Sequence, residues 1–585
     1  MKNISNKILT LALALTILIT FSFSPVSANT TSQEGEKVLQ IISFNDFHGS
    51  LKEGSKELGY AKFVAALNSE KESNPNTIVV SAGDNFQGSA MSNLTYGEPV
   101  NEMMNALDVV ASAVGNHEFD WGVDQITKWQ ENANYTFLAS NIYDKETNEP
   151  VAWAKPYKFV EVDGVKIALI GLSTLETAYK TKAENVKTLE FKDAAVAAQI
   201  WIDYLKSGKD ENGVPDVIVA LTHIGAKQDA YGSDLTKPVT GEEIENLCNN
   251  VTGLDAVVTG HSHSSVSGYI NNIPVIQGYK NGRAYGKLTI TMNADGTLEE
   301  IVPALNNAYK TKDDVTPDAA ALKAYDKWNT ELSPILDKVL GQASDTFTHS
   351  KLDNVSVLGR WVCETMAKKV NTQIAIQNGG GLRRDIPSGD ITYGTLYEVM
   401  PFDNTLVTMD LLGSDILKNI EYGTDNTTVG NASYSGLIVA YDSSKEAGSK
   451  VTSISLSDGT PLEMNKYYSV VINDFMYPTG DNFDFTNAKN FVDTFVPIRD
   501  VLIDEIKASG TIVAKKADYV TKVIPLIKIE DIAKTTYDTY IVKDGDVLWK
   551  IAEQFKTTYN KLGDLNKLKN VNLIFQGQEL LVPAK

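Results

Sequence analysis

The chain has 585 residues, 43% of them hydrophobic and 22% charged. At about 150 residues per domain this length predicts several domains, and the ordinary composition excludes a disordered, collagenous or multi-pass membrane protein. The 53 Lys and Arg against 74 Asp and Glu give a net charge of −21, which argues against a nucleic-acid polymer as partner because the basic face that such binding needs is missing. Cys248 and Cys363 are the two cysteines, too few for a disulfide scaffold or a cysteine-rich metal site.

The N-terminus has the three-part layout of a secretory signal. Lys2 and Lys7 precede an apolar stretch at 8–23, and Val26-Ser27-Ala28 supplies the small residues of a cleavage site. Because the stretch is short for a membrane span, we predict that residues 1–28 are a cleaved signal peptide; an uncleaved anchor is the alternative. No other apolar run approaches span length, so we expect an exported protein without a transmembrane partner.

Residues 38–305 show short apolar runs that each stop at a polar cluster, with amphipathic stretches at 60–70 and 123–131 between them. This alternation predicts strands and helices of a layered α/β domain. The predicted strands cover 38–43, 77–82, 111–114, 166–173, 216–222 and 254–259.

Three further segments follow this domain. Residues 306–340 are expected to form a helical connector, and residues 341–526 a second α/β domain with a helix at 357–370, a strand at 373–377 and a glycine run at 379–381. The last segment, 538–584, differs in charge, since its residues 540–583 have six lysines against five acids in an otherwise acidic chain.

Five of the six histidines fall in polar clusters at the ends of predicted strands. Imidazole nitrogen mixed with carboxylate and amide oxygen suits borderline divalent ions such as zinc or manganese. Two such ions about 3.5 to 4 Å apart can clamp a phosphoryl group and generate a hydroxide nucleophile. One cluster alone could be turn chemistry, but five in one domain predict a metal site. The clusters are Asp46-Phe47-His48, Gly83-Asp84-Asn85-Phe86-Gln87-Gly88, Gly115-Asn116-His117-Glu118, Thr222-His223 and Gly260-His261-Ser262-His263.

These clusters resemble the motifs of the calcineurin-like metallophosphoesterases: Asp-x-His, Gly-Asp-x-x-x-Gly, Gly-Asn-His-Glu/Asp, a lone His, and Gly-His-x-His. All five are present without a substitution. The resemblance implies a four-layer α/β/β/α domain and two divalent ions, zinc, manganese or cobalt. It assigns one ion to Asp46, His48, Asp84 and His263, and the other to Asp84, Asn116, His223 and His261.

His117 is left without a metal in this assignment. A free imidazole beside a two-metal site is placed to stabilise transition-state charge or to protonate the leaving oxygen, and Asp120 could fix its tautomer. The run Gly-Asn-His-Glu-Phe-Asp resembles the 5′-nucleotidase branch, where that His and Asp form a catalytic dyad. The alternative is that Asp120 is the N-cap of the next helix.

The second domain carries candidate substrate contacts on loops. Arg383 follows the glycine run and can bind phosphate or carboxylate through its bidentate fork. Phe402 and Phe475 could stack a base, with Asn404 and Asp481 bonding its edge or the ribose; from residue type alone, a core role for both rings is favoured.

The same segments resemble the 5′-nucleotidase C-terminal domain, with Leu382, Asp403 and Thr479 as mismatches. The resemblance reverses the preference for a core role and gives Arg383, the two rings, Asn404 and Asp481 the substrate contacts named above. Periplasmic members carry further arginines before the helix at 357–370, whereas this chain offers only Lys351 there. Lys is a poorer phosphate fork, so preference among mono-, di- and cyclic phosphates stays open.

The tail predicts a βααβ module. Its opening Tyr-x-Val-x-x-Gly-Asp from Tyr540 and its closing Gly-Gln-x-Leu-x-Val-Pro ending at Pro583 resemble the lysin motif (LysM), which binds N-acetylglucosamine in peptidoglycan or chitin. An ordinary helical cap is the alternative.

Together, the resemblances predict an exported 5′-nucleotidase that releases nucleoside and phosphate, with nucleotide and peptidoglycan as partners and the cell wall or extracellular space as location. Alternatives on the same site are a 2′,3′-cyclic-nucleotide phosphodiesterase and a UDP-sugar or dinucleotide pyrophosphatase. A wall-binding protein with an inactive phosphatase domain is the rival from another class, and the complete set of motif residues argues against it.

Overall fold

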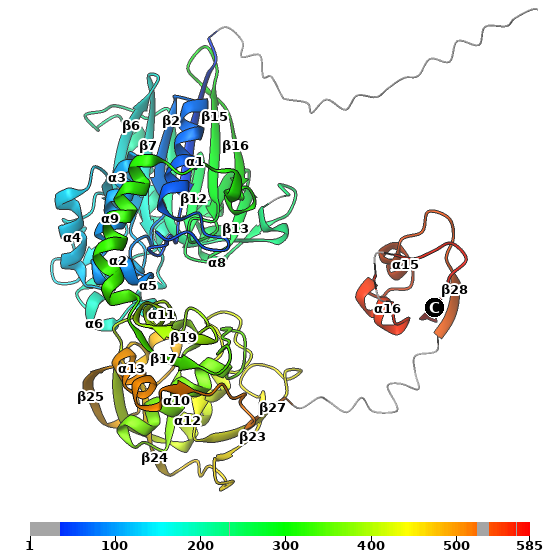
Figure 1. Ribbon diagram of the computed structural model, residues 1–585. Coiled ribbons are helices and arrows are strands. Elements are labelled where there is room, and N and C mark those ends of the chain that lie inside the picture. Colours follow the sequence, from blue (N-terminus) through cyan, green and yellow to red (C-terminus); the bar gives the residue numbers. More distant parts are fainter. Residues whose placement is uncertain (1–34, 233, 523–536, 569, 572, 585) are drawn as a thin grey trace, which may run out of the picture.

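The computed structural model describes residues 35–584 except 233, 523–536, 569 and 572. The predicted signal peptide, residues 1–28, lies outside the described residues. Figure 1 shows the α/β domains in chain order, the first in blue to green and the second in yellow-green to orange.

Two six-stranded sheets form the first domain. The first sheet has the order β16 (Leu298–Asn306), β15 (Tyr285–Met292), β1 (Lys37–Phe44), β2 (Thr77–Ser81), β3 (Val109–Ala113) and β4 (Thr136–Leu138). The second has the order β13 (Ser265–Ile270), β14 (Ile273–Gly278), β12 (Ala256–Gly260), β9 (Val217–Gly225), β7 (Val165–Ser173) and β6 (Tyr157–Val162).

The two sheets pack face to face through alternate residues of their strands. In β1, Leu39 and Ile41 lie in the core between the sheets, whereas Ile42 and Phe44 face the helices outside, as expected from the period of two in a strand. Val219 of β9 meets the same inner core. The result is the predicted α/β/β/α layering.

Helices cover both outer faces. The first sheet is covered by α1 (Gly59–Ser73), α3 (Glu98–Ala106) and α4 (Val123–Asn132), and the second by α7 (Ala194–Lys206) and α8 (Glu242–Asn250). α7 begins after Asp193, whose side chain accepts the N–H of Val196 and so satisfies one of the unpaired donors of the first turn.

Parallel pairing sets where the site forms. Strands β1, β2 and β3 run parallel in one sheet, and β9 and β12 run parallel in the other. The loops that leave their carboxyl ends therefore gather at one edge, where α/β sheets keep their sites.

The predicted connector of 306–340 is a helix over only part of its length. Helix α9 spans Ala319–Leu336, and Asp318 caps it by accepting the N–H of Ala321. The prediction that the helix reaches residue 340 is wrong, because Val339–Ala343 forms strand β17, which pairs with β19 (Gly389–Thr392) of the second domain. In Figure 1, α9 runs beside the first domain down to the second, and it packs on α1 and on α11 (Tyr393–Val399).

The second domain is built on a five-stranded sheet whose two faces are both buried. Helices α10 (Val357–Val370) and α13 (Ile498–Ser509) cover one face, and α12 (Gly413–Tyr422) covers the other. Its strands have the order β21 (Ser433–Ser435), β18 (Ile374–Gln377), β24 (Tyr467–Asn473), β20 (Thr405–Leu412) and β25 (Lys489–Pro497).

The tail has the predicted βααβ order. Antiparallel strands β28 (Tyr537–Ile541) and β29 (Glu579–Pro583) enclose α15 (Leu548–Gln554) and α16 (Tyr559–Leu565) around a small apolar core. Among the helices of the described residues, none combines the length and apolar character needed to cross a membrane.

Candidate metal centre and substrate cavity

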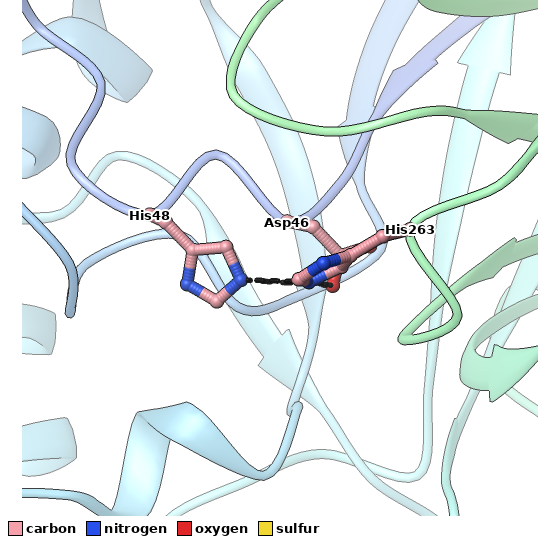
Figure 2. A group of neighbouring side chains, drawn as sticks. All are labelled: Asp46, His48 and His263. Carbon is pink, nitrogen blue, oxygen red and sulfur yellow. Dashed lines mark hydrogen bonds and ion pairs between the residues drawn. The ribbon is translucent and has the colours of Figure 1, made fainter. Parts of the chain in front are cut away.

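The structure brings Asp46, His48 and His263 together, although His263 is more than 200 residues from the other two in sequence. Figure 2 shows the three side chains converging from two separate loops. His263 Nε2 lies 3.0 Å from His48 Nε2 and 3.3 Å from Asp46 Oδ1. Two imidazoles and a carboxylate in this arrangement form one candidate ligand group.

Asp84, His223 and His261 form a second group beside it. His223 Nε2 lies 3.0 Å from Asp84 Oδ2, and His261 Nδ1 lies 2.9 Å from Asn116 Oδ1. All seven predicted ligand residues thus lie in or beside two neighbouring clusters.

The backbone of these loops is strained. Asp46, His48, Asp84, His261 and His263 have positive φ angles of 47°, 49°, 56°, 70° and 51°. A residue other than glycine in this region costs on the order of 1–3 kcal/mol, and such strain concentrates at functional sites. The surrounding fold therefore holds five of the seven predicted ligands in a costly conformation.

The motif glycines leave room for the ligands. A Cβ on Gly115 would stand 2.3 Å from Asp84 Oδ1. A Cβ on Gly83 would stand 2.9 Å from His223 Nδ1, and its φ of +87° also disfavours any other residue.

Glu118, a motif residue for which the sequence suggested no role, stabilises the ligand-bearing loops through hydrogen bonds to their backbone. Its buried carboxylate accepts backbone N–H groups from Asp84, Asn85 and Gly115, at 2.9, 2.9 and 2.6 Å. Burial raises its pKa to about 7. One side chain thus ties together the loops that follow β2 and β3.

The residues fit divalent ions. Asp46 Oδ1 and His223 Nε2 are buried, and their near polar neighbours, His263 Nε2 at 3.3 Å and Asp84 Oδ2 at 3.0 Å, are themselves predicted ligands, so an ion between them would meet donor atoms from both sides. Burial lowers the pKa of His48 and of His263 well below the usual range, and neutral imidazole is the form that binds metal.

His117 and Asp120 form the predicted pair, with His117 Nδ1 2.8 Å from Asp120 Oδ2. Burial alone lowers the pKa of His117, but the carboxylates of Asp120 and Asp84 outweigh it and raise the pKa above its usual value. The alternative N-cap role for Asp120 is wrong, because α4 begins at Val123 with Gly122 as its N-cap.

A cavity of about 1490 Å³ joins this centre to the second domain. All five predicted substrate contacts line it: Arg383, Phe402, Asn404, Phe475 and Asp481. The Phe402 ring stacks on that of His117, with centroids 5.6 Å apart and an angle of 23° between planes. The guanidinium of Arg383 lies 5.8 Å from the Phe402 ring centre.

Both phenylalanines are half-buried, so neither has the full burial expected of a residue that serves only the core. Phe475 also packs against the apolar core of the second domain, so one side of it supports the fold while it lines the cavity. Phe402 contacts His117 and Arg383, which are themselves cavity residues.

Asn404 and Asp481 are held by neighbours. Asn404 Nδ2 donates to Asp474 Oδ1 at 2.8 Å, and Asp481 Oδ2 accepts from Asn378 Nδ2 at 2.7 Å. Asp481 Oδ1 also pairs with Lys180 of the first domain, 3.1 Å away.

Further functional residues were missed by sequence reasoning. Lys182 of the first domain pairs with Asp474 of the second at 2.5 Å, and Arg384 of the second pairs with Glu57 of the first at 3.3 Å. Glu176 Oε2 lies 2.7 Å from His261 Nε2 and orients that imidazole. No local motif marks these residues, and only folding brings them to the site.

Lys280 also lines the cavity, with Nζ 3.4 Å from His263 Nδ1. Burial, with the nearby charges of Arg383 and Arg283, lowers its pKa to about 8. His349, the one histidine outside the strand-end clusters, bridges Ser356 Oγ at 2.9 Å and the carbonyl oxygen of Gly379 at 3.1 Å, and so supports the glycine run.

Comparison with known proteins finds a matching domain family for each of the three folded regions. Residues 39–265 match the calcineurin-like phosphoesterase family, residues 339–488 the 5′-nucleotidase C-terminal domain, and residues 540–583 the LysM domain.

Two relatives and one solved structure show the extent of the similarity. Endonuclease YhcR of Bacillus subtilis is 29% identical over 76% of this chain, and the match covers 37% of that protein, so the chain spans little more than a third of it. Cell wall protein Lmo0130 of Listeria monocytogenes is 29% identical, with 94% of this chain and 77% of that protein covered. The crystal structure of a 5′-nucleotidase precursor from Thermus thermophilus has 28% identity and a TM-score of 0.71, covering 83% of this chain and 99% of that one.

The four-layer fold and the two histidine and carboxylate groups at its strand ends define a metallophosphoesterase. Divalent metals are the cofactors of this class. Residues 39–265 are thus similar to metal-dependent phosphoesterases, residues 339–488 to the C-terminal domain of 5′-nucleotidases, and the LysM domain follows these two regions.

Proposed function

We propose that the protein is an exported, dinuclear-metal phosphohydrolase that cleaves nucleoside 5′-phosphates to nucleoside and phosphate. The observation that carries this proposal is the single cavity lined both by metal-ligand residues and by Arg383, Phe402 and Phe475. A phosphate at the ligand groups and a base between the rings require such a shared space.

The ligand residues act in two groups. Asp46, His48, Asp84 and His263 hold one ion, and Asp84, Asn116, His223 and His261 hold the other. Zinc, manganese or cobalt ions, when bound, polarise the phosphoryl oxygens and lower the pKa of water.

His117 serves the leaving group. Asp120 occupies Nδ1 and so leaves Nε2 to hold a proton. As the bond between phosphorus and the 5′ oxygen breaks, that proton passes to the oxygen of the departing nucleoside, while the oxygen of a water molecule bonds to phosphorus and that water releases one proton to solvent. Nε2 is regenerated when it takes a proton from solvent.

The second domain selects the substrate. Arg383 is half-buried, and among the described side chains it has no carboxylate within ion-pair distance, so its fork is available to phosphate. Phe402 and Phe475 stack the base, and Asn404 and Asp481 bond the nucleoside.

Wall retention is the second part of the proposal. The LysM domain binds N-acetylglucosamine glycan such as peptidoglycan, and the similarity to Cell wall protein Lmo0130 supports a wall location. Residues 1–28 direct export as a cleaved signal peptide.

A panel of phosphoesters tests the activity. Metal-stripped protein is assayed for phosphate release from nucleoside 5′-monophosphates, 2′,3′-cyclic AMP and UDP-glucose, with zinc, manganese or cobalt added back. We expect the highest kcat/KM for the 5′-monophosphates. A preference for the cyclic nucleotide or the UDP-sugar would mean that this ester, and not the nucleoside 5′-monophosphate, is the substrate. No turnover of any phosphoester with these metals would contradict the proposed activity.

A further inference from the structure

The loop between β14 and β15 holds Lys280 against the metal centre. Its neighbours Tyr279 and Asn281 both have left-handed φ angles, 61° and 55°. The Tyr279 carbonyl accepts from Asn45 Nδ2 at 2.7 Å, and the Asn281 backbone N–H donates to the carbonyl of Asp46 at 2.8 Å. The loop is therefore fastened to the metal-binding loop after β1, and Lys280 is fixed between the two anchors.

The ammonium of Lys280 has no carboxylate partner in the part of the chain that the structure describes. Among the described residues, no carboxylate oxygen lies within 4.0 Å of Lys280 Nζ. Its polar neighbour is His263 Nδ1, at 3.4 Å. Since His263 turns Nε2 toward Asp46, 3.3 Å away, an ion bound at Nε2 leaves the ring proton on Nδ1, and two donors then face each other.

Arg383 is a second half-buried cation that lines the same cavity. Arg383 reaches the cavity from the second domain and interacts electrostatically with Lys280. The hydrogen bond from its guanidinium to the carbonyl of Gly380 is a long one, 3.4 Å. Two half-buried cations that repel each other beside a metal centre are stabilised by an anion placed between them.

The amount of anionic charge separates two classes of substrate. A phosphomonoester carries about −1.5 to −2 charges at pH 7, whereas a diester carries about one, because its second oxygen is esterified. The bound ions and Arg383 can contact the phosphoryl group of either ester. Lys280 is an additional cation, and it favours the ester that has the additional charged oxygen.

Resting on the proposed function, we propose that Lys280 binds a non-bridging phosphoryl oxygen on the His263 side of the centre and selects phosphomonoester dianions over diester monoanions. The choice between nucleotidase and cyclic phosphodiesterase, open from the sequence, is then decided in part by one lysine that lies outside every motif.

The test compares Lys280→Met and Lys280→Arg with wild type on AMP and on bis(p-nitrophenyl) phosphate. A charged hydrogen bond of this kind is worth about tenfold to hundredfold, so we expect Lys280→Met to lower kcat/KM for AMP by that factor and for the diester by less than about threefold. Lys280→Arg should restore most of the difference. Equal losses on both substrates, or no loss on AMP, would overturn the assignment.

Two further measurements keep the result interpretable. Metal content and melting temperature of Lys280→Met should equal those of wild type, and Lys56→Met, which removes an exposed lysine of the first domain, is the matched control and should not change the substrate ratio. Calorimetric titration of the metal-loaded proteins with inorganic phosphate should show about tenfold weaker binding to Lys280→Met. Because this titration needs no turnover, it tests Lys280 even if wild type fails to hydrolyse AMP, in which case only the proposed function is wrong.

Discussion

The two walls of the cavity differ in how their polar side chains are partnered. On the wall from the first domain, the polar neighbours of buried Asp46 Oδ1 and His223 Nε2 are other predicted ligands, His263 Nε2 at 3.3 Å and Asp84 Oδ2 at 3.0 Å. On the wall from the second domain, Asn404 is already bonded to Asp474 and Asp481 to Asn378. On the first wall, predicted ligands face one another, as a bound ion requires, whereas Asn404 and Asp481 on the second wall are held in place by hydrogen bonds within the protein.

This contrast predicts two kinds of defect. Changes on the first wall should remove the chemistry whatever the substrate, because the ions act on every phosphoryl group. Changes on the second wall should alter only how well a nucleoside is bound.

Loss of metal is expected to have the largest effect. Chelation, or Asp84→Asn, should lower phosphate release by about a thousandfold or more, since the ions supply several kcal/mol of transition-state stabilisation. The assay is phosphate release with nucleotide and with p-nitrophenyl phosphate, before and after adding zinc, manganese or cobalt. Added metal should also raise the melting temperature of the stripped wild type, and activity that survives chelation would contradict the assignment of the first wall.

Replacement of the dyad should rank next. His117→Ala should lower kcat by about 10²- to 10⁴-fold, the usual contribution of general acid–base catalysis, while the preference among bases is kept. Steady-state kinetics on several nucleoside monophosphates measure both quantities. A changed base preference would mean that the ring of His117 serves binding through its stack with Phe402 more than it serves proton transfer.

The aromatic residues should sharpen the contrast. Phe402→Ala or Phe475→Ala should raise KM for nucleotides about 5- to 150-fold, because stacking of a base is worth about 1–3 kcal/mol. Hydrolysis of p-nitrophenyl phosphate should hardly change. If Phe475→Ala lowers the hydrolysis of nucleotides and of p-nitrophenyl phosphate equally, Phe475 acts through its contact with the apolar core, and its assignment to base stacking is wrong.

Removal of the tail should have the smallest effect on catalysis. A chain ending at Ile529 should keep kcat and KM on soluble nucleotides within about twofold, while its co-sedimentation with purified peptidoglycan is lost. Equal sedimentation of the truncated and full-length proteins would transfer wall binding to another surface. Lost activity would show that the tail also supports the two α/β domains.

Sequence patterns predicted the fold and most of the first wall, for a physical reason. Buried parallel strands appear in the sequence as apolar runs, and the carboxyl ends of such strands lie at one edge of the sheet. Polar residues that directly follow these runs are therefore expected to be neighbours. The connector was predicted too long because Val339 and Leu340 continue an apolar pattern without a break, whereas pairing with β19 makes them part of a strand.

Partners between domains could not be predicted in this way. Lys180 and Asp481 are 301 positions apart, and neither lies in a periodic pattern that fixes the other. Lys280 was missed for a related reason, since an isolated lysine in a loop carries no signal until the fold shows that it faces a histidine instead of a carboxylate.

The contact of Asp481 with Lys180 couples the proposed nucleoside contact to the interface between the two α/β domains. The same carboxylate that is proposed to bond the nucleoside also joins the second domain to the first, beside the Lys182–Asp474 and Arg384–Glu57 pairs. A ligand that engages Asp481 changes the free energy of that ion pair, and by thermodynamic reciprocity the ion pair changes the affinity for the ligand by the same amount. The affinity for the nucleoside and the strength of this interface are then coupled, and a nucleotide analogue that does not reach Asp481 leaves the ion pair unchanged.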